Sequence, residues 1–211
     1  MLRSRRPVSA SPKNVVTAQD VQAVPPGGEL TTALGAIVTP WARELAATRG
    51  VRIVHAAAAP GAVVVAVGAD HGGFPMKEDI KGHLTRLGYP FRDLGTFSTA
   101  AVDYPDIALA VARAVRSGEA ALGILVDGAG IGSAMAANKV PGVRAAVVHD
   151  EAAARNAREH NDANVMSLGA KFVKDGTLGA IVETFLTARC TEERHSKRVD
   201  KIKAIEESYL K

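Results

Sequence analysis

One stretch decides the fold of this chain: Ile124-Leu-Val-Asp-Gly-Ala-Gly-Ile-Gly-Ser-Ala-Met-Ala-Ala-Asn-Lys139. It runs from an apolar strand through a glycine-rich turn into a helix of small residues. The glycines Gly128, Gly130 and Gly132 let the main chain turn sharply and approach a ligand closely, and the start of the helix offers unpaired N–H groups to an anion. Asp127 interrupts this pattern, because a carboxylate beside a cradle of amides either repels the anion or acts on it as a base.

Strands and helices alternate on both sides of this stretch. Short apolar runs predict strands at residues 63–68, 91–94, 121–126, 143–148 and 164–168, and helical spacing predicts helices between them. Two further helices, near residues 175–188 and 198–208, close the chain. This alternation predicts an α/β fold: a doubly wound, Rossmann-like, five-stranded parallel sheet with helices on both faces, plus a small N-terminal extension.

The composition shifts along the chain predict four segments. Residues 1–13 form a disordered basic tail, and residues 14–56 form a small N-terminal module with a helix that Thr39-Pro40 opens and Gly50 ends. Residues 57–62 are a linker. Residues 63–211 form the main domain.

The composition also excludes several classes of protein. The 211 residues are 47% hydrophobic and 23% charged with a net charge of +4, which is typical of a globular protein. The basic excess lies mostly at the two ends, so we expect no nucleic-acid partner. The longest apolar stretch, residues 56–69, is broken by Pro60-Gly61 and is too short to cross a membrane. The single cysteine, Cys190, excludes an intrachain disulfide, and we expect a cytoplasmic protein.

Polar residues follow the predicted strands at the edge where parallel sheets bind ligands. Asp70-His71 follows the first strand, Asp127 the third and His149-Asp150 the fourth. His71 is a candidate phosphate contact or proton carrier. The alternative is that Asp70 only caps a helix and His71 is merely exposed. Asp103, which precedes Tyr104-Pro105, could likewise simply be the N-cap of a helix.

Two later motifs carry more polar groups. The run from His160 to Val165 concentrates them where a helix gives way to a strand, although a core histidine and simple turn formers would explain the same residues. Arg194 and Arg198 are one helical turn apart, the spacing that holds a phosphate from two sides, and a solvated helix face is the alternative. The glycine loop itself reads G-x-G-x-G, so it matches neither the dinucleotide nor the nucleoside triphosphate fingerprint.

Taken together and in this order, the motifs resemble the family of ribose-5-phosphate isomerase B and galactose-6-phosphate isomerase. The resemblance extends over residues 63–206. Its segments are Gly68 to Phe74, Asp93 to Thr96, Val102 to Pro105, Gly128 to Lys139, Pro141 to Ala145, Arg158 to Val165, and Arg194 to Arg198.

The resemblance implies an isomerase that interconverts ribose 5-phosphate and ribulose 5-phosphate, or a closely related sugar phosphate, through a cis-enediolate. It implies no metal and no organic cofactor, and a homodimer or homotetramer with shared active sites. It assigns ring opening to His160, and stabilisation of the enediolate oxygen to Asn161 with the amides of the loop. The expected substrate-binding residues are Asp70, His71, Tyr104, Gly128, Gly130, Gly132, Lys171, Arg194 and Arg198.

Three positions depart from the family pattern. Asp127 stands where many members have the proton-shuttling cysteine, Ala129 replaces Thr or Ser, and Lys171 replaces a frequent phosphate arginine. Ser133 occupies the position of an acidic residue in some relatives. Our hypothesis is that Asp127 transfers the proton between C1 and C2, because a carboxylate is ionised at neutral pH without activation. The alternatives are a non-catalytic sugar-phosphate sensor and one subunit of a heteromeric galactose-6-phosphate-type isomerase.

The family domain does not require the first 60 residues. The segments Val16 to Val21 and Gly35 to Leu45 resemble N-terminal segments of bacterial microcompartment enzymes. This resemblance implies docking to a microcompartment shell. The alternative is a helical decoration that extends the oligomer interface.

Overall fold

The computed structural model describes residues 15–33, 36–55 and 62–210. The chain divides into two compact units, Met1–Ala59 and Pro60–Lys211. The tail predicted at residues 1–13 and residues 57–61 of the predicted linker lie outside the described residues. Within the described ranges, no helix combines the length and the apolar character that a membrane span requires.

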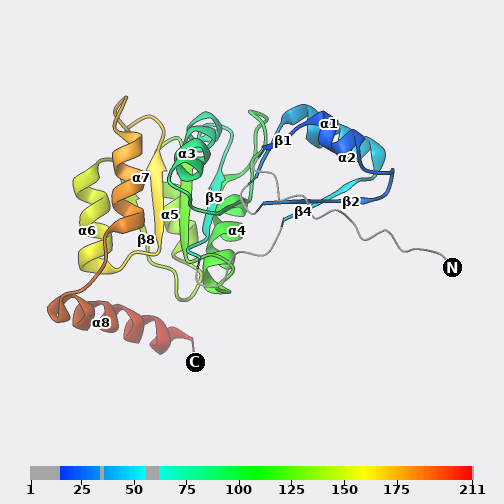
Figure 1. The fold of residues 1–211 in the computed structure, drawn as a ribbon. Helices are drawn as coiled ribbons and strands as arrows, with labels where there is room; N and C mark the ends of the chain where they lie inside the picture. The colour runs from blue at the N-terminus through cyan, green and yellow to red at the C-terminus, as the bar shows by residue number, and fades with distance from the viewer. Residues whose placement is uncertain (1–14, 34–35, 56–61, 211) are drawn as a thin grey trace. The chain divides into compact units, whose positions relative to one another are not determined.

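The second unit holds the predicted α/β fold (Figure 1). Its elements in chain order are β5 (Val65–Ala69), α3 (Phe74–Arg86), β6 (Phe91–Asp93), α4 (Tyr104–Arg116), β7 (Leu122–Asp127), α5 (Ile131–Ala137), β8 (Ala145–Val148), α6 (Glu151–Asn161), β9 (Val165–Gly169), α7 (Leu178–Thr187) and α8 (Glu193–Tyr209).

The strands of this unit form one parallel sheet in the order β6-β5-β7-β9-β8. Helices α3, α6 and α7 cover one face, and α4 and α5 cover the other. Every residue of β5, β7 and β9 is buried, as expected for strands enclosed on both faces. The strand order reverses between β5 and β7, and ligands of such sheets bind at the carboxyl ends of the strands at this point.

The predicted fold class is confirmed, and each predicted strand is present with its start displaced by at most two residues. One boundary was wrong: the last helix begins at Glu193, not near residue 198. Its first turn is polar and carries no apolar periodicity. Only His195 and Val199 are buried along this helix, so the pattern that normally announces a helix is absent there.

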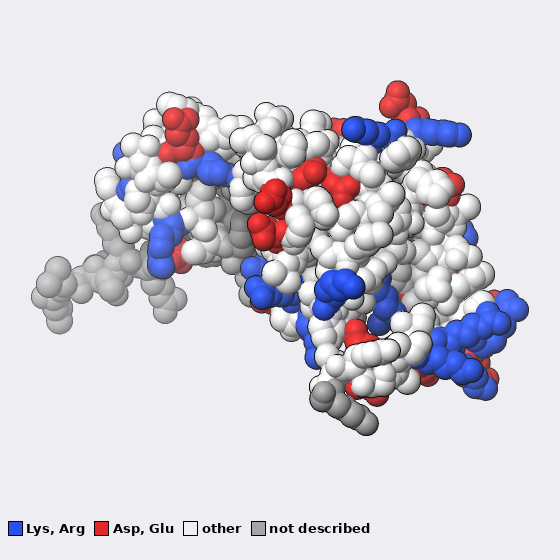
Figure 2. All heavy atoms as spheres, turned by 180° about the vertical axis from the view of Figure 1, so that it is seen from behind, with Lys and Arg blue, Asp and Glu red and all other residues white. Residues whose placement is uncertain are grey.

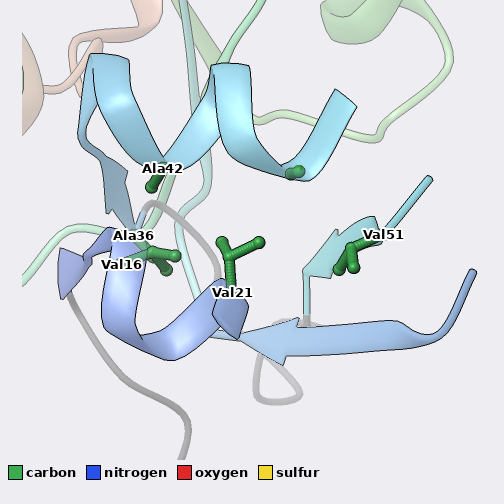
Figure 3. Packing of buried hydrophobic residues seen from close by; sticks show 6 residues of the cluster. Val16, Val21, Ala36, Ala42 and Val51 are labelled. Atoms are coloured by element: carbon green, nitrogen blue, oxygen red, sulfur yellow. The ribbon is translucent and has the colours of Figure 1, made fainter. Parts of the chain in front are cut away.

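The first unit has a small core of its own (Figure 3). Val16, Val21, Ala42 and Val51 pack together with Ala36 and Ala46. Strand β1 pairs with β3 and β2 pairs with β4, both in parallel. The elements are β1 (Val15–Val16), α1 (Ala18–Gln22), β2 (Glu29–Thr32), β3 (Ile37–Val38), α2 (Pro40–Arg49) and β4 (Arg52–His55). Helix α2 lies where the sequence predicted it and ends at a left-handed Gly50.

Candidate active site

Asp127 ends β7 and turns its carboxylate into the glycine loop that follows. Its Oδ1 accepts hydrogen bonds from the amides of Ala129, at 2.8 Å, and Gly130. Its Oδ2 accepts one from the amide of Ser133, at 3.0 Å. The side chain is 5% exposed. The anion that the amide cradle holds in this structure is therefore the chain's own carboxylate.

These contacts decide the protonation state of Asp127. Burial raises the pKa of the carboxyl, but the Ser133 hydroxyl and the amides of Gly130, Ala129 and Ser133 together lower it below its usual range. Asp127 is consequently ionised at neutral pH, and the same donors make it a weaker base than a free carboxylate. They also fix the direction in which the carboxylate points.

The loop keeps its shape because it presses against the end of β9. Gly130 has a φ of +77°, which favours glycine, and a Cβ at this position would lie 2.8 Å from the amide nitrogen of Gly169. The Ser167 hydroxyl donates to the carbonyl oxygen of Gly130 at 2.6 Å. The backbone that holds Asp127 is thus fixed by packing and by a buried hydrogen bond.

Several of the other predicted site residues surround this loop. The Tyr104 ring covers Gly132 so closely that a Cβ there would lie 2.6 Å from Cζ of the ring. A Cβ at Gly128 would lie 3.7 Å from Cε of Lys171, and the amide of Lys171 donates to the Gly128 carbonyl at 3.2 Å. These residues come from three separate segments of the chain.

Asp70 and His71 complete the group at this edge of the sheet. Asp70 Oδ1 accepts a hydrogen bond from the Gly73 amide at 2.8 Å, which braces the turn before α3, but the N-cap of this helix is Gly73 itself, so Asp70 is not a capping residue. Gly73 packs against the end of strand β7, and a Cβ on Gly73 would lie 2.4 Å from the Val126 carbonyl oxygen. His71 is exposed, and its Nδ1 lies 3.4 Å from the Val102 amide. The carboxyl-edge cluster, as we call it, consists of Asp70, His71, Tyr104, Asp127, the loop 128–132 and Lys171.

The remaining predicted residues lie at the opposite edge of the same sheet. Helix α6 starts after the carboxyl end of β8 and runs back, so His160 and Asn161 lie beside the amino ends of the strands. The next turn confirms this placement, since the Asn164 carbonyl accepts from the Gly123 amide at the start of β7. Helix α8, which carries Arg194 and Arg198, begins at this edge too (Figure 1). We call these four residues the amino-edge cluster.

The polar run that begins at His160 has a mixed explanation. Asp162 is a left-handed helix end, and its side chain and carbonyl bind Arg144, so the turn-forming alternative is correct for this residue. Asn164 joins the Arg144 amide to the Gly142 carbonyl. Asp150, the other candidate near this helix, caps α6 by accepting from the Ala153 amide. His160 and Asn161 have no comparable role in the turn.

His160 stacks on a second histidine, His195 of α8. The ring centroids are 4.1 Å apart and the planes differ by 14°. Nδ1 of His160 lies 3.0 Å from Nδ2 of Asn156. The Arg194 guanidinium pairs with Glu192 at 2.5 Å. Figure 2 shows Lys and Arg side chains gathered where α8 lies, with Asp and Glu side chains among them, and Lys197 and Lys203 also form ion pairs there.

An open groove of about 940 Å³ adjoins the amino-edge cluster. Asn161, the edge strand β8 and the last turns of α8 line it. Its exposed apolar side chains are Val147, Ile202, Ile205, Tyr209 and Leu210. Strand β8 ends the sheet on this side. An apolar, concave face beside an open strand edge is typical of a protein interface.

Two residues at the site were not assigned roles from the sequence. Ser133 lies six positions after Asp127, and the helical turn after the loop brings its amide back to the carboxylate. His195 lies between the two candidate arginines in sequence. Its burial was predictable, because Val199 follows four residues later on the same face of the helix. Among the residues that the structure describes, no group of three or more His, Cys, Asp or Glu side chains is arranged to hold a metal ion.

Comparisons with known proteins identify the family of the second unit. A sequence model of the family described as Ribose/Galactose Isomerase matches residues 65–202. Ribose-5-phosphate isomerase B of Escherichia coli (strain K12) is 42% identical over 143 residues, which are 68% of this chain and 96% of that protein.

Two solved structures extend the match. The structure of Clostridium thermocellum ribose-5-phosphate isomerase B has a TM-score of 0.68 and 46% identity, covering 70% of this chain and 99% of that one. The chain belongs to the Ribose/Galactose Isomerase family. A second relative with this fold, ribose-5-phosphate isomerase B of Mycoplasma genitalium, has been solved with bound ribulose-5-phosphate at a TM-score of 0.65 and 41% identity, covering 69% of this chain and 97% of that one. Since these family members match over almost their whole length while about a third of this chain stays unmatched, they have no counterpart of its first unit.

Proposed function

We propose that this protein interconverts ribose 5-phosphate and ribulose 5-phosphate. The observation that carries the proposal is the carboxyl-edge cluster, in which one ionised carboxylate, a glycine loop and a lysine meet at the strand reversal of the sheet. The family relationship supports the same reaction, because relatives over 40% identical are ribose-5-phosphate isomerases B and one of them binds ribulose-5-phosphate.

The cationic residues account for binding of the phosphate. His71 and Lys171 belong to the carboxyl-edge cluster, and Arg194 and Arg198 lie one turn apart on α8. A phosphate dianion held from two sides by guanidinium groups is fixed in orientation as well as position. His160 then transfers a proton between the ring oxygen and the C1 hydroxyl, which breaks the C1–O4 bond and gives the open aldehyde.

Asp127 is the proposed base for the isomerisation step. It takes the proton from C2, and the electron pair of that bond forms the C1–C2 double bond while the negative charge moves to O1. The proton returns to C1 and a proton passes from O2 to O1, which gives the ketose. The amides of Ala129, Gly130 and Ser133 already hold Asp127. The charge on O1 is therefore assigned to Asn161 and to the other amides of the loop 128–132.

The separation of the two clusters supports an active site shared between two copies. A substrate held at the carboxyl edge is out of reach of His160 and Asn161 of the same chain. We propose a homodimer, alone or paired into a tetramer, in which the amino-edge cluster of one copy meets the carboxyl-edge cluster of the other. The apolar groove beside Asn161 is the proposed contact surface, because a second copy would cover both it and the open edge of β8.

The purified protein alone, assayed by NMR in deuterium oxide, tests this function. The expected result is conversion of ribose 5-phosphate with deuterium entering at the carbons between which the proton moves. Tight binding without conversion would favour the sensor, and conversion only after a partner chain is added would favour the heteromeric subunit. Conversion of tetrose or hexose phosphates in preference to ribose 5-phosphate would reassign the substrate within the same chemistry.

We propose a separate role for the first unit, docking to a microcompartment shell within the cytoplasm. Its own small core supports an independent module, and Trp41 on its surface is 60% exposed. Residues 1–60 fused to a fluorescent protein should form foci in cells that make shells. A diffuse signal would leave the unit as an extension of the oligomer, and deletion of residues 1–60 would then change the oligomeric mass.

A further inference from the structure

His195 is a buried histidine in which both ring nitrogens lack a hydrogen-bond partner among the described residues. The residue is 3% exposed, and neither Nδ1 nor Nε2 makes a hydrogen bond. Its nearest charged group, the Glu192 carboxylate, lies 3.6 Å from Nε2. Buried polar atoms without partners cost free energy, because they lose their hydrogen bonds to water. The ring nitrogens of His195 therefore do not stabilise the fold through hydrogen bonds.

The contact that His195 does make is the face of its ring against His160. The planes are nearly parallel, with centroids 4.1 Å apart. His160 lies in the last turn of α6, and within the described part of the chain its side-chain hydrogen bond is to the exposed Asn156. The buried ring of His195 is consequently the rigid surface against which the more exposed ring of His160 is held.

We propose that His195 is a positioning residue, whose buried ring fixes the plane of His160 for the opening and closing of the sugar ring. This inference rests on the proposed function, and it adds a residue that does not itself touch the substrate. A proton transfer to the ring oxygen depends on the direction of one imidazole nitrogen, and a misplacement of about 1 Å can cost a hundredfold in rate. A stacked partner restricts His160 without occupying either of its nitrogens.

The charge of His195 is consistent with this role. Burial lowers the pKa of His195, and His160, Arg194 and Arg198 lower it further, while Glu192 opposes them. His195 is therefore neutral at neutral pH, so it does not repel a proton on His160. A neutral, buried ring is what a platform requires.

The test compares His195→Phe, which keeps a buried flat ring, with His195→Ala, which removes it. Two rates are measured for each variant in the full chain. The first is the kcat for conversion of ribose 5-phosphate, which needs ring opening. The second is the exchange of deuterium into C1 of ribulose 5-phosphate, which needs only the enediolate. Ribulose 5-phosphate stays open because its C5 oxygen carries the phosphate. Val199→Ala is the matched control, since it removes a buried side chain one turn further along α8.

For His195→Ala we expect a kcat at least about tenfold lower, with the exchange rate within about twofold of the wild type. His195→Phe should retain both rates within about threefold, and Val199→Ala should lower thermal stability without separating the two rates. If His195→Phe were as impaired as His195→Ala, the ring nitrogens would be doing the chemistry and the inference would fail. An equal loss of conversion and exchange in His195→Ala would also overturn it.

Two measurements stand apart from catalysis. The His160 Hε1 proton should show a ring-current shift that His195→Phe keeps and His195→Ala loses. Because His195 has a lowered pKa in the folded state, its contribution to stability should be lost as the pH falls below about 6.5, the ordinary value for histidine. The Tm of His195→Phe should therefore fall less between pH 7.5 and 5.5 than that of the wild type. If the wild type neither converts nor exchanges substrate, the proposed function fails, while these two results still decide whether the stack exists.

Discussion

Asp127 and His160 lie at opposite edges of one parallel sheet. Asp127 is the last residue of β7, whereas His160 is in the last turn of α6, beside the residues that open β9. Strand β9 has five residues, so the two edges are roughly 15 Å apart at about 3.3 Å per residue. A pentose phosphate bound at Asp127 cannot reach across the sheet to His160. The proposed reaction therefore calls for catalytic groups from two copies of the chain.

Subunit complementation tests this arrangement. Asp127→Asn and His160→Asn should each be inactive, but coexpression of the two chains should restore about a quarter of the wild-type activity. Random pairing makes half of the dimers mixed, and each mixed dimer contains one site with both wild-type residues. The measurement is the specific activity of the whole coexpressed mixture, and mixed dimers isolated through different tags on the two chains should show about half of the wild-type activity.

A pair of variants from a single cluster is the matched control. Asp127→Asn coexpressed with Asp70→Asn places both changes at the carboxyl edge, so neither site of a mixed dimer is intact and activity should stay low. If the test pair recovered no more activity than the control pair, each chain would build its own site.

The identity of the base gives the second prediction. The chain has one cysteine, Cys190, so a Cys190→Ser background contains no thiol. In that background iodoacetamide should leave activity unchanged. Asp127→Asn should lower kcat by about 10² to 10⁴, the usual value of a general base, while phosphate binding persists. Asp127→Cys should recover part of the loss, because the same amides would favour a thiolate.

The activity of Asp127→Cys should be sensitive to iodoacetamide, whereas Asp127→Asn has no thiol that this reagent could alkylate. Circular dichroism of each variant checks that the fold is kept. Retention of full kcat by Asp127→Asn would remove Asp127 from the role of base and leave it as the anchor of the glycine loop.

The sheet could be predicted from sequence because each strand has its own local signal. The runs at β5, β7 and β9 are largely apolar, as burial on both faces requires, with Asp127 and Ser167 as the polar exceptions, and residues 128–132 mark the turn at the strand reversal. In the first unit, β4 has such a signal in the mostly apolar run at residues 51–54, but β1, β2 and β3 have none. Strands β1 and β3 contain two residues each and pair across a long separation in sequence, so their existence depends on the tertiary fold.

The separation of the site into two clusters could be predicted from whether each candidate residue follows or precedes a strand. Asp127 follows a predicted strand, whereas His160 precedes one, and in a parallel sheet these positions lie at opposite edges. The contacts of Asp127 could not be predicted in the same way. They depend on a side-chain rotamer and on the curvature of the loop between Ala129 and Ser133, neither of which has a sequence pattern.

A buried lysine gives the third prediction. The Lys77 side chain is fully buried, and its Nζ lies 2.5 Å from Asp93 Oδ1 and 2.6 Å from the Thr96 carbonyl oxygen. Lys77→Met should lower the free energy of unfolding by about 3 kcal/mol, because it leaves part of the Asp93 charge uncompensated away from water. Urea denaturation of the full chain measures this change.

Lys81→Met is the comparison for Lys77. Lys81 is 7% exposed, and it binds the other oxygen of Asp93 at 2.7 Å and the half-exposed Glu78. Its removal should cost less, since Lys77 would still neutralise Asp93 and water can reach Glu78. A larger cost for Lys81→Met than for Lys77→Met would contradict this assignment.

The contact between Gly132 and Tyr104 gives the last prediction. A Cβ at Gly132 would lie 2.6 Å from Cζ of the Tyr104 ring, so Gly132→Ala must displace the ring from the glycine loop. We expect kcat/KM for ribose 5-phosphate to fall about tenfold in Gly132→Ala and similarly in Tyr104→Ala. The double variant should be no worse than Tyr104→Ala, because the added methyl group then has nothing to displace.

Gly82→Ala is the control for adding a methyl group to a helical glycine. A Cβ at Gly82 would meet only the end of the Arg86 side chain, at 3.6 Å, so this variant should keep wild-type activity and gain about 0.5–1 kcal/mol of stability. Additive losses in the Gly132 and Tyr104 double variant would mean that the two residues act separately. In that case Tyr104 would serve the sugar site through some contact other than its packing on the loop.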